Sequence, residues 1–158
     1  MNLITFDDVI KDPKAYVSDI HTHEFQDLAD GDNTFRNIQS RDRYDEFAKY
    51  VTNLFDGYSV KLNFIRKSPL NQLEPNFIHT DEMMGDITCL LYLNEVEPEE
   101  NGTTIYDKDN NPLVTMYSKF NRMVAFNADA PHSRNIFENF GEGEDARLVQ
   151  IIFLKAKQ

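Results

Sequence analysis

Three residues have the types and spacing needed to hold a metal ion. His79 and Asp81 lie one residue apart in "FIHTDEMM", and His132 lies much further along in "NADAPHSRN". Because side chains at positions i and i+2 of a strand point the same way, His79 and Asp81 can present an imidazole and a carboxylate to one point. Two histidines and one carboxylate form the face that holds non-haem Fe(II) and leaves positions open for a co-substrate and dioxygen. The sequence therefore predicts His79, Asp81 and His132 as metal ligands and catalytic residues.

An arginine near the end of the chain could bind an anionic co-substrate. Arg147 opens the run "RLVQIIFLK", which has the composition of a strand. A buried arginine needs an anionic partner, and its planar guanidinium suits one carboxylate of a dicarboxylic acid. The acidic turn at 142–145 is the alternative partner if Arg147 lies at the surface. Arg134 is a rival anchor, because in an extended segment it would share the face of His132.

The first 57 residues are expected to form helical support for the rest. Apolar residues at near-helical spacing follow Thr5, a candidate N-cap, and Pro13 is expected to divide this stretch into two short helices. The segment "SRDRYDEFAKYVTNLFDG" carries an apolar stripe of helical period, with Ser40 as its expected N-cap and Gly57 as its expected stop.

From residue 58 onward the pattern is that of strands. "YSVKLNFIRKS" alternates and is expected to place Val60, Leu62 and Phe64 on one side. Five further β-type runs follow: "DITCLLYLNE", "GTTIYD", "LVTMYSK", "RMVAFNA" and "ARLVQIIFLK". Short strands separated by turn signals favour a sandwich or jelly roll. We therefore expect one mainly β domain over 1–158, with helical support at 1–57 and a jelly-roll core at 58–158.

Composition narrows the partners and the compartment. A formal net charge of −11 and a pI of about 4.7 disfavour binding to nucleic acid. No apolar run approaches the ~20 residues of a membrane span, so no membrane partner is expected. The single cysteine, Cys89, excludes an internal disulfide and fits a reducing, cytoplasmic location. Cys89 lies in an apolar run, where we expect it to fill space in the core.

The order of these motifs resembles that of the Fe(II)/2-oxoglutarate-dependent dioxygenases, and within them the prolyl-4-hydroxylase-like branch. The matching stretches, which fall within 58–154, are "HTD", "DITCLLYLNE", "NGTTIYD", "FNRMVAFNADAPHS" and "ARLVQIIF". The resemblance implies a double-stranded β-helix, a cupin-like jelly roll with the metal inside one mouth. It also implies Fe(II), 2-oxoglutarate and O2, and hydroxylation of a C–H in a free or peptidyl amino acid such as proline, or in another small molecule. Succinate and CO2 would be the co-products.

The same resemblance assigns roles to individual residues. The two histidines and the aspartate resemble the iron ligands, and Arg147 resembles the basic residue that pairs with the 5-carboxylate of 2-oxoglutarate. Tyr92 resembles a tyrosine that hydrogen-bonds this carboxylate, and Thr104 and Asn63 are candidates for the pocket wall. The segment between His132 and Arg147 is longer than in the family pattern. The aspartate of "HTD" disfavours the related halogenases, which have a small residue there.

Alternatives remain open at the level of sequence. His21 and His23 in "HTHEF" could suggest a cupin-type His-x-His site, although they lie among helix-like residues. A non-catalytic jelly-roll binding module and a cupin-like metalloenzyme that needs no 2-oxoglutarate are the rival functions. Substrate contacts are expected from the segments 30–41, 66–76 and 81–86. Nothing in the sequence indicates an oligomeric state.

Overall fold

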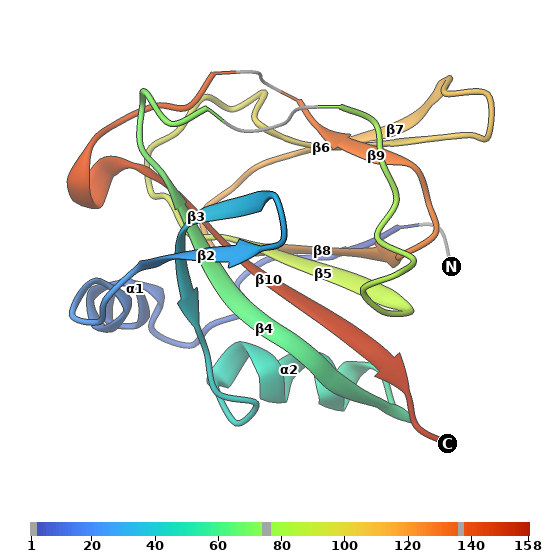
Figure 1. Cartoon of the computed structure of the whole chain (residues 1–158). Helices are drawn as coiled ribbons and strands as arrows, with labels where there is room; N and C mark the ends of the chain where they lie inside the picture. The colour runs from blue at the N-terminus through green and yellow to red at the C-terminus, as the bar shows by residue number, and fades with distance from the viewer. Residues whose placement is uncertain (1–2, 74–76, 136–137) are drawn as a thin grey trace.

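Two antiparallel sheets face each other across the interior of the protein. The computed structural model describes residues 3–73, 77–135 and 138–158, and Figure 1 shows the smaller sheet above the larger one. In order across it, the larger sheet contains β1 (Ile4–Phe6), β8 (Arg122–Asn127), β5 (Ile87–Tyr92), β10 (Arg147–Ala156), β4 (Tyr58–Ser68), β3 (Asn33–Ser40) and β2 (Gln26–Asp30). The smaller sheet contains β7 (Pro112–Tyr117), β6 (Gly102–Tyr106) and β9 (His132–Arg134). This is the jelly-roll architecture that the sequence predicts.

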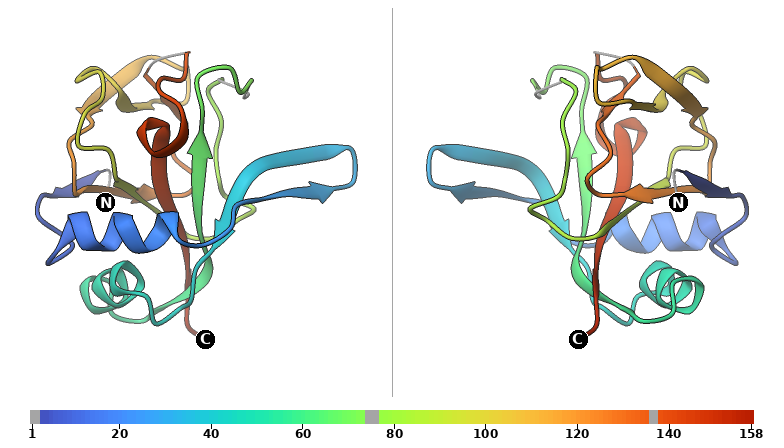
Figure 2. Two further views of the ribbon diagram at one scale, coloured as in Figure 1. Left: turned by 90° about the vertical axis from the view of Figure 1, so that its left-hand side faces the viewer. Right: turned by 90° about the vertical axis from the view of Figure 1, so that its right-hand side faces the viewer.

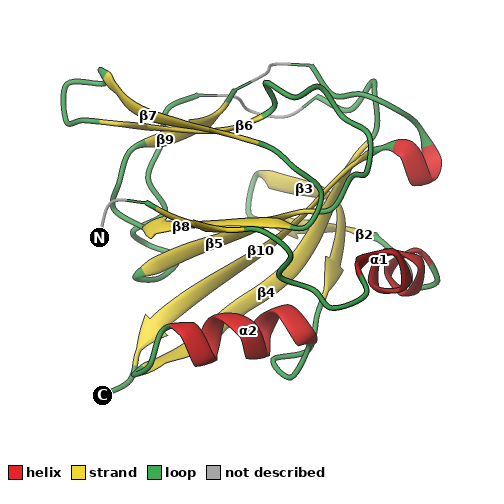
Figure 3. Ribbon diagram, turned by 180° about the vertical axis from the view of Figure 1, so that it is seen from behind, coloured by secondary structure: helices red, strands yellow, loops and turns green. Residues whose placement is uncertain are grey.

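Two helices cover the outer face of the larger sheet. They are α1 (Pro13–His21) and α2 (Glu46–Leu54), and Figure 3 shows both on the side away from the smaller sheet. Ile20, Phe47 and Val51 are fully buried against the sheet. A short 3-10 turn, η1 (Gly143–Asp145), precedes β10. In the described residues, no helix is long and apolar enough to cross a membrane.

The central strands bury both of their faces. Along β10, Leu148 and Ile152 belong to the core under the helices, whereas Val149, Ile151 and Phe153 belong to a second apolar cluster between the sheets. This alternation follows from the two-residue period of a strand. Arg147 has the same parity as Val149, so the sheet directs its side chain into the interior.

The first 57 residues contain more than helices. Ile4–Phe6 forms β1, which pairs with β8, and β2 and β3 form a hairpin that Figure 2 shows projecting from the body. Pro13 does not divide two helices: it begins α1, where its missing N–H costs nothing. The prediction of purely helical support at 1–57 was therefore incomplete.

The predicted start of α2 was wrong by several residues. Its N-cap is Asp45 rather than Ser40, which lies in β3, and the Asp45 side chain does not cap the helix. The Asp45 carboxylate instead accepts hydrogen bonds from Tyr16 and from Gln150 Nε2, the latter at 2.8 Å. These bonds give the buried amide of Gln150 a partner inside an otherwise apolar strand.

A β-bulge divides the inward-facing residues of β4. The pairing with β10 shifts between Phe153 and Leu154. As a result Val60 packs toward the helices, whereas Phe64 packs into the cluster between the sheets. The prediction that Val60, Leu62 and Phe64 share one side was thus wrong for Val60, because a bulge adds a residue to one strand and reverses the alternation beyond it.

Candidate metal centre

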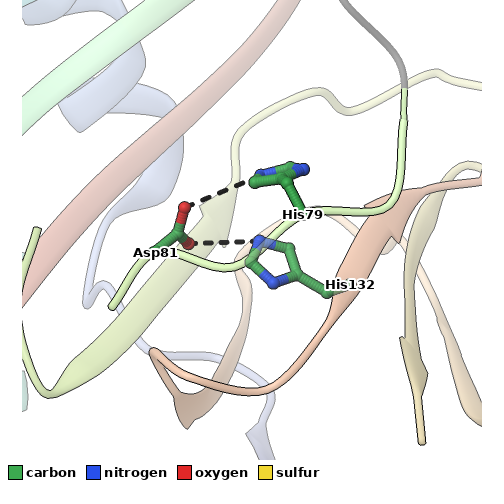
Figure 4. Close-up of side chains that lie close together, drawn as sticks. All are labelled: His79, Asp81 and His132. Atoms are coloured by element: carbon green, nitrogen blue, oxygen red, sulfur yellow. Dashed lines mark ion pairs between the residues drawn. The ribbon is translucent and has the colours of Figure 1, made fainter. Parts of the chain in front are cut away.

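His79, Asp81 and His132 converge, as Figure 4 shows. One ligand atom from each residue lies within 4.8 Å of the other two. Asp81 Oδ1 is 3.6 Å from His79 Nε2, and Asp81 Oδ2 is 3.1 Å from His132 Nε2. Among the described residues this is the one group of three or more histidine, cysteine or acidic side chains close enough to share an ion.

Backbone pairing brings the two histidines together. The amide of His79 donates to the carbonyl of His132 at 3.0 Å, and the amide of His132 donates back at 2.9 Å. Asp81 continues this pairing, because its amide donates to Ala128 O at 2.7 Å. Two chain segments that are distant in sequence therefore form an isolated antiparallel bridge with both rings on the same side.

The imidazole rings are oriented for metal binding. His79 Nδ1 lies 2.9 Å from Phe77 O, and His132 Nδ1 lies 2.9 Å from Ala130 O. A carbonyl can only accept, so each Nδ1 carries a proton, and Nε2 is the ring nitrogen that would bind a metal ion. Hydrogen bonds of this kind are what fix the tautomer of histidine ligands in metalloproteins.

The carboxylate of Asp81 is held in its charged form. Burial would raise the pKa of Asp81, but His132, a hydrogen bond from Thr88 and the neighbouring His79 lower it by more. Thr88 Oγ1 donates to Asp81 Oδ2 at 3.0 Å. Thr88 was not recognised in the sequence, although it is the polar residue whose parity on β5 matches Leu90 and Tyr92. Two imidazoles and one carboxylate suit Fe(II), and the single cysteine, Cys89, lies in the core under the helices.

A cavity of about 190 Å³ opens beside His79, Asp81 and His132. Its walls are apolar in part, from Phe64, Leu90 and Val149 among others, but three arginines also line it: Arg66, Arg134 and Arg147. Among the described residues that line it, Asp81 is the one acidic residue. The interior is therefore positively charged in a protein whose net charge is −11, which favours an anionic occupant.

Arg147 lies where a co-substrate carboxylate could reach it. Its side chain is 8% exposed and lines the cavity. Arg134, the rival anchor, lines the same cavity and donates to Asn139 Oδ1 at 2.8 Å. The structure brings both arginines together with the three ligands.

Tyr92 lies one layer behind the cavity. It is buried, and its hydroxyl is 2.7 Å from Thr103 Oγ1, which does line the cavity. Burial raises the pKa of Tyr92 to about 12, although the Thr103 bond and the charge of Arg147 lower it. Tyr92 therefore remains a neutral phenol near Arg147. The alternation of β6 directs Thr103 inward and Thr104 outward, where Thr104 bonds Thr115 and Asn135.

Asn63 does not line the cavity that contains Arg134 and Arg147. Its Nδ2 donates to Asp42 O at 2.9 Å, and its Oδ1 accepts from Gln150 Nε2 at 2.8 Å. The buried amide is thus satisfied within the protein. It lines a neighbouring hollow instead.

The other candidate residues lie outside the centre. His23 is exposed and pairs with Asp19 on α1 at 3.6 Å, and neither His21 nor His23 joins the metal-binding group among the described residues. Cys89 is buried in the core under the helices, where burial raises the pKa of its thiol. Part of the expected substrate segment 66–76, namely 74–76, lies outside the described residues.

Comparison with known proteins places the fold. No protein-family model and no curated protein sequence matches the chain. A search of solved structures finds the non-heme alpha-ketoglutarate-dependent epimerase SnoN from nogalamycin biosynthesis, with a TM-score of 0.66 at 14% identity over 98% of this chain and 78% of that one. SnoN is also known in complex with Fe3+ and alpha-ketoglutarate.

Two further structures support the same placement. A prolyl hydroxylase from Trichoplax adhaerens, solved with a hypoxia inducible factor peptide, matches with a TM-score of 0.66 at 14% identity, over 98% of this chain and 84% of that one. A 2OG-Fe(II) oxygenase family protein from Burkholderia pseudomallei matches with a TM-score of 0.62 at 10% identity, over 98% and 85%. The chain therefore has the double-stranded β-helix fold of the 2-oxoglutarate–Fe(II) oxygenases, with a His-Asp-His cluster between its sheets.

Proposed function

We propose that the protein is an Fe(II)- and 2-oxoglutarate-dependent oxygenase that hydroxylates a C–H bond of its substrate. The observation that carries the proposal is the convergence of His79, Asp81 and His132 beside a cavity lined with arginines. Iron bound there with 2-oxoglutarate and O2 would insert one oxygen atom into a C–H bond as 2-oxoglutarate becomes succinate and CO2. The protein supplies ligands, orientation and charge for this chemistry.

Arg147 binds the 5-carboxylate of 2-oxoglutarate in this proposal. Its burial and its position on the interior face of β10 support the role, because a guanidinium can hold a carboxylate through two parallel hydrogen bonds. The hydroxyl of Thr103, itself bonded to Tyr92, lines the same cavity and completes the polar end. Arg147→Met should therefore weaken 2-oxoglutarate binding more than Arg134→Met does, and the reverse order would make Arg134 the anchor.

The apolar walls of the cavity limit access of water. Phe64, Leu90, Val149, Ile151 and Phe153 surround the ligands on the interior side. Excluding water strengthens the ionic contacts of a bound dicarboxylate and protects reactive species from side reactions. A small molecule or a peptide would deliver the C–H bond from the open side of the ligands.

Formation of succinate tests the proposal against both rivals. Purified protein supplied with Fe(II), 2-oxoglutarate and air should release succinate slowly even without substrate, and His79→Ala should abolish the release. Thr104→Val is the matched control, because this outward-facing residue should leave the release unchanged. No succinate and no metal uptake would favour a binding module. Iron uptake without binding of 2-oxoglutarate would favour a cupin-like enzyme of another kind.

A further inference from the structure

A second hollow of about 430 Å³ adjoins the metal centre. It shares Phe64, Arg66, His79, Asp81 and Phe153 with the cavity described above. The two spaces therefore meet at the metal ligands. A molecule lying in the second hollow would have one end within reach of the metal.

The far walls of the hollow are apolar and exposed. Leu28 and Phe35 come from the β2–β3 hairpin that projects in Figure 2, and each is 43% exposed. Leu62 and Met84 line the hollow and are 38% and 39% exposed. Exposed apolar side chains gathered around one hollow mark a binding surface rather than chance exposure.

Arg66 stands at the inner end of this apolar surface. It lies on β4 opposite Val149 of β10, an alignment that places it on the interior side of the sheet. It is the one lysine or arginine among the described residues that line the hollow. Within the described part of the chain, its guanidinium makes no hydrogen bond and no ion pair. A half-buried arginine without a partner is suited to an anionic ligand.

We propose, on the basis of the oxygenase function above, that the substrate is a small amphipathic acid. Its anionic group pairs with Arg66, and its apolar body lies against the hairpin and against Leu62 and Met84. The bond that is hydroxylated then belongs to a carbon close to the anionic group, because Arg66 and the metal ligands line the same junction.

The position of Arg66 differs from that of the two arginines considered for the co-substrate. Arg134 and Arg147 line only the smaller cavity, whereas Arg66 lines both spaces. With 2-oxoglutarate held by an arginine of the smaller cavity, Arg66 remains available to a second anion. Because the protein carries a net negative charge, the molecule as a whole repels an anion, and an anionic ligand depends on a local cation such as Arg66 for its binding.

A pair of fluorescent probes tests the proposal. Anilinonaphthalene sulfonate has an apolar body and one anionic group, and N-phenylnaphthylamine is its uncharged parent. Both are titrated into protein loaded with Fe(II) and 2-oxoglutarate under anaerobic conditions. Arg66→Met should weaken binding of the sulfonate by about tenfold, the loss of one charge-assisted contact, and should change binding of the parent less than twofold. Arg66→Lys should restore part of the sulfonate affinity, whereas Leu62→Ser should weaken both probes.

Lys67→Met is the matched control. Lys67 follows Arg66 on β4, but its ammonium group lies over the ring of Phe25, and Lys67 does not line the hollow. The substitution removes one positive charge and should leave both probes unaffected. Equal binding of the sulfonate to wild type and Arg66→Met would overturn the proposal. So would a loss of 2-oxoglutarate affinity in Arg66→Met, followed through the visible absorption of the iron complex, because Arg66 would then serve the co-substrate. If that absorption fails to form in the wild type, the oxygenase function itself fails.

Discussion

Each histidine of the candidate metal centre uses one ring nitrogen for a backbone carbonyl, which leaves the other available for a metal ion. His79 and His132 obtain these carbonyls from Phe77 and Ala130, each two residues earlier in the chain. These local bonds to the backbone orient both imidazole rings, and a hydrogen bond from Thr88 orients the carboxylate of Asp81.

Thr88→Val should weaken metal binding without unfolding the protein. The substitution keeps the shape of the side chain and removes the hydrogen bond to Asp81 Oδ2. Loss of a partner that orients a ligand lowers metal affinity by about tenfold to a hundredfold. Anaerobic calorimetric titration with Fe(II) measures the change. Thr104→Val, an equivalent change on the outward face of β6, is the control, and equal affinities in the two variants would contradict the role of Thr88.

The half-buried carboxyl of Glu97, outside the candidate metal centre, predicts that Glu97→Gln stabilises the protein increasingly as the pH rises. Burial raises the pKa of Glu97 above its usual value of 4.5, although Asn101 and Arg147 lower it in part. The folded protein therefore binds the proton more tightly than the unfolded chain, and stability from this group is lost as the pH rises through the folded pKa. Glu97→Gln keeps an acceptor for Asn101 Nδ2 and removes the buried charge.

Urea unfolding at several pH values checks this prediction. Glu97→Gln should match the wild type well below pH 4.5, where the carboxyl is protonated in both states, and should become the more stable protein as the pH rises. Glu99→Gln, at an exposed position, should show no such trend. A stability difference that is constant with pH would show that the charge of Glu97 is not the cause.

At the scale of elements, the loop from Asp81 to β5 is pressed against the end of β10. The amide of Asp86 donates to Leu154 O at 2.7 Å, and the Asp86 carboxylate accepts from the amide of Ala156 at 2.8 Å. Gly85 allows this approach, because a Cβ there would lie 2.8 Å from Leu154 O. The position of Asp81 depends on this contact.

Gly85→Ala should therefore affect both stability and metal binding. Forcing a methyl group against a backbone carbonyl costs about 1–3 kcal/mol, and the loop that carries Asp81 must move. Thermal unfolding and Fe(II) titration measure the two effects. Met84→Ala changes the neighbouring, partly exposed residue and should leave metal binding as in the wild type; a normal affinity in Gly85→Ala would mean that the loop does not position Asp81.

The strands of the core could be predicted from the sequence because their residues alternate or form apolar runs. The predicted segments from 58 to 68 and from 146 to 155 correspond to β4 and β10. The strands before α2 could not be predicted this way: β2 is exposed along its whole length, so no apolar period marks it. β9 is only three residues long and is defined by its pairing with β6.

The same distinction holds for the site. The residue types and the i, i+2 spacing of His79 and Asp81 predict that these two side chains meet, and the structure places them together with His132. The choice between Thr103 and Thr104 depends on the phase of β6, which neighbouring apolar residues do not reveal, since both threonines are buried. The role of Arg66 depends on the alignment of β4 with β10, a long-range property that local sequence does not encode.

At the scale of the whole molecule, the helices, the larger sheet and the smaller sheet form three layers. The residues of the main core and those of the candidate metal centre lie on opposite faces of the larger sheet. The helices and the outer face of the larger sheet enclose the main apolar core, whereas the metal centre lies between the sheets. Arg147 and the core residue Leu148 are neighbours on β10 yet face opposite sides. A change in the core should therefore lower stability while leaving the ligands in place.

Phe47→Ala tests this separation. Phe47 is fully buried between α2 and the sheet, and removing such a side chain costs about 3–5 kcal/mol. Urea unfolding measures the loss, and Fe(II) affinity below the transition should stay within twofold of the wild type. Tyr44→Ala, at a residue that is 64% exposed, should change stability by less than about 0.5 kcal/mol. A large loss of metal affinity in Phe47→Ala would show that the layers are not independent.

Anaerobic titration of the metal-free protein, first with Fe(II) and then with 2-oxoglutarate, tests the central claim most directly. A visible charge-transfer absorption should appear only when both are present, because the keto acid must bind the iron that His79, Asp81 and His132 hold. The band should be absent in Asp81→Ala and retained in Thr104→Val. A wild-type protein that gives no band, or an Asp81→Ala variant that gives the same band, would contradict the assignment of these three residues as an oxygenase metal centre.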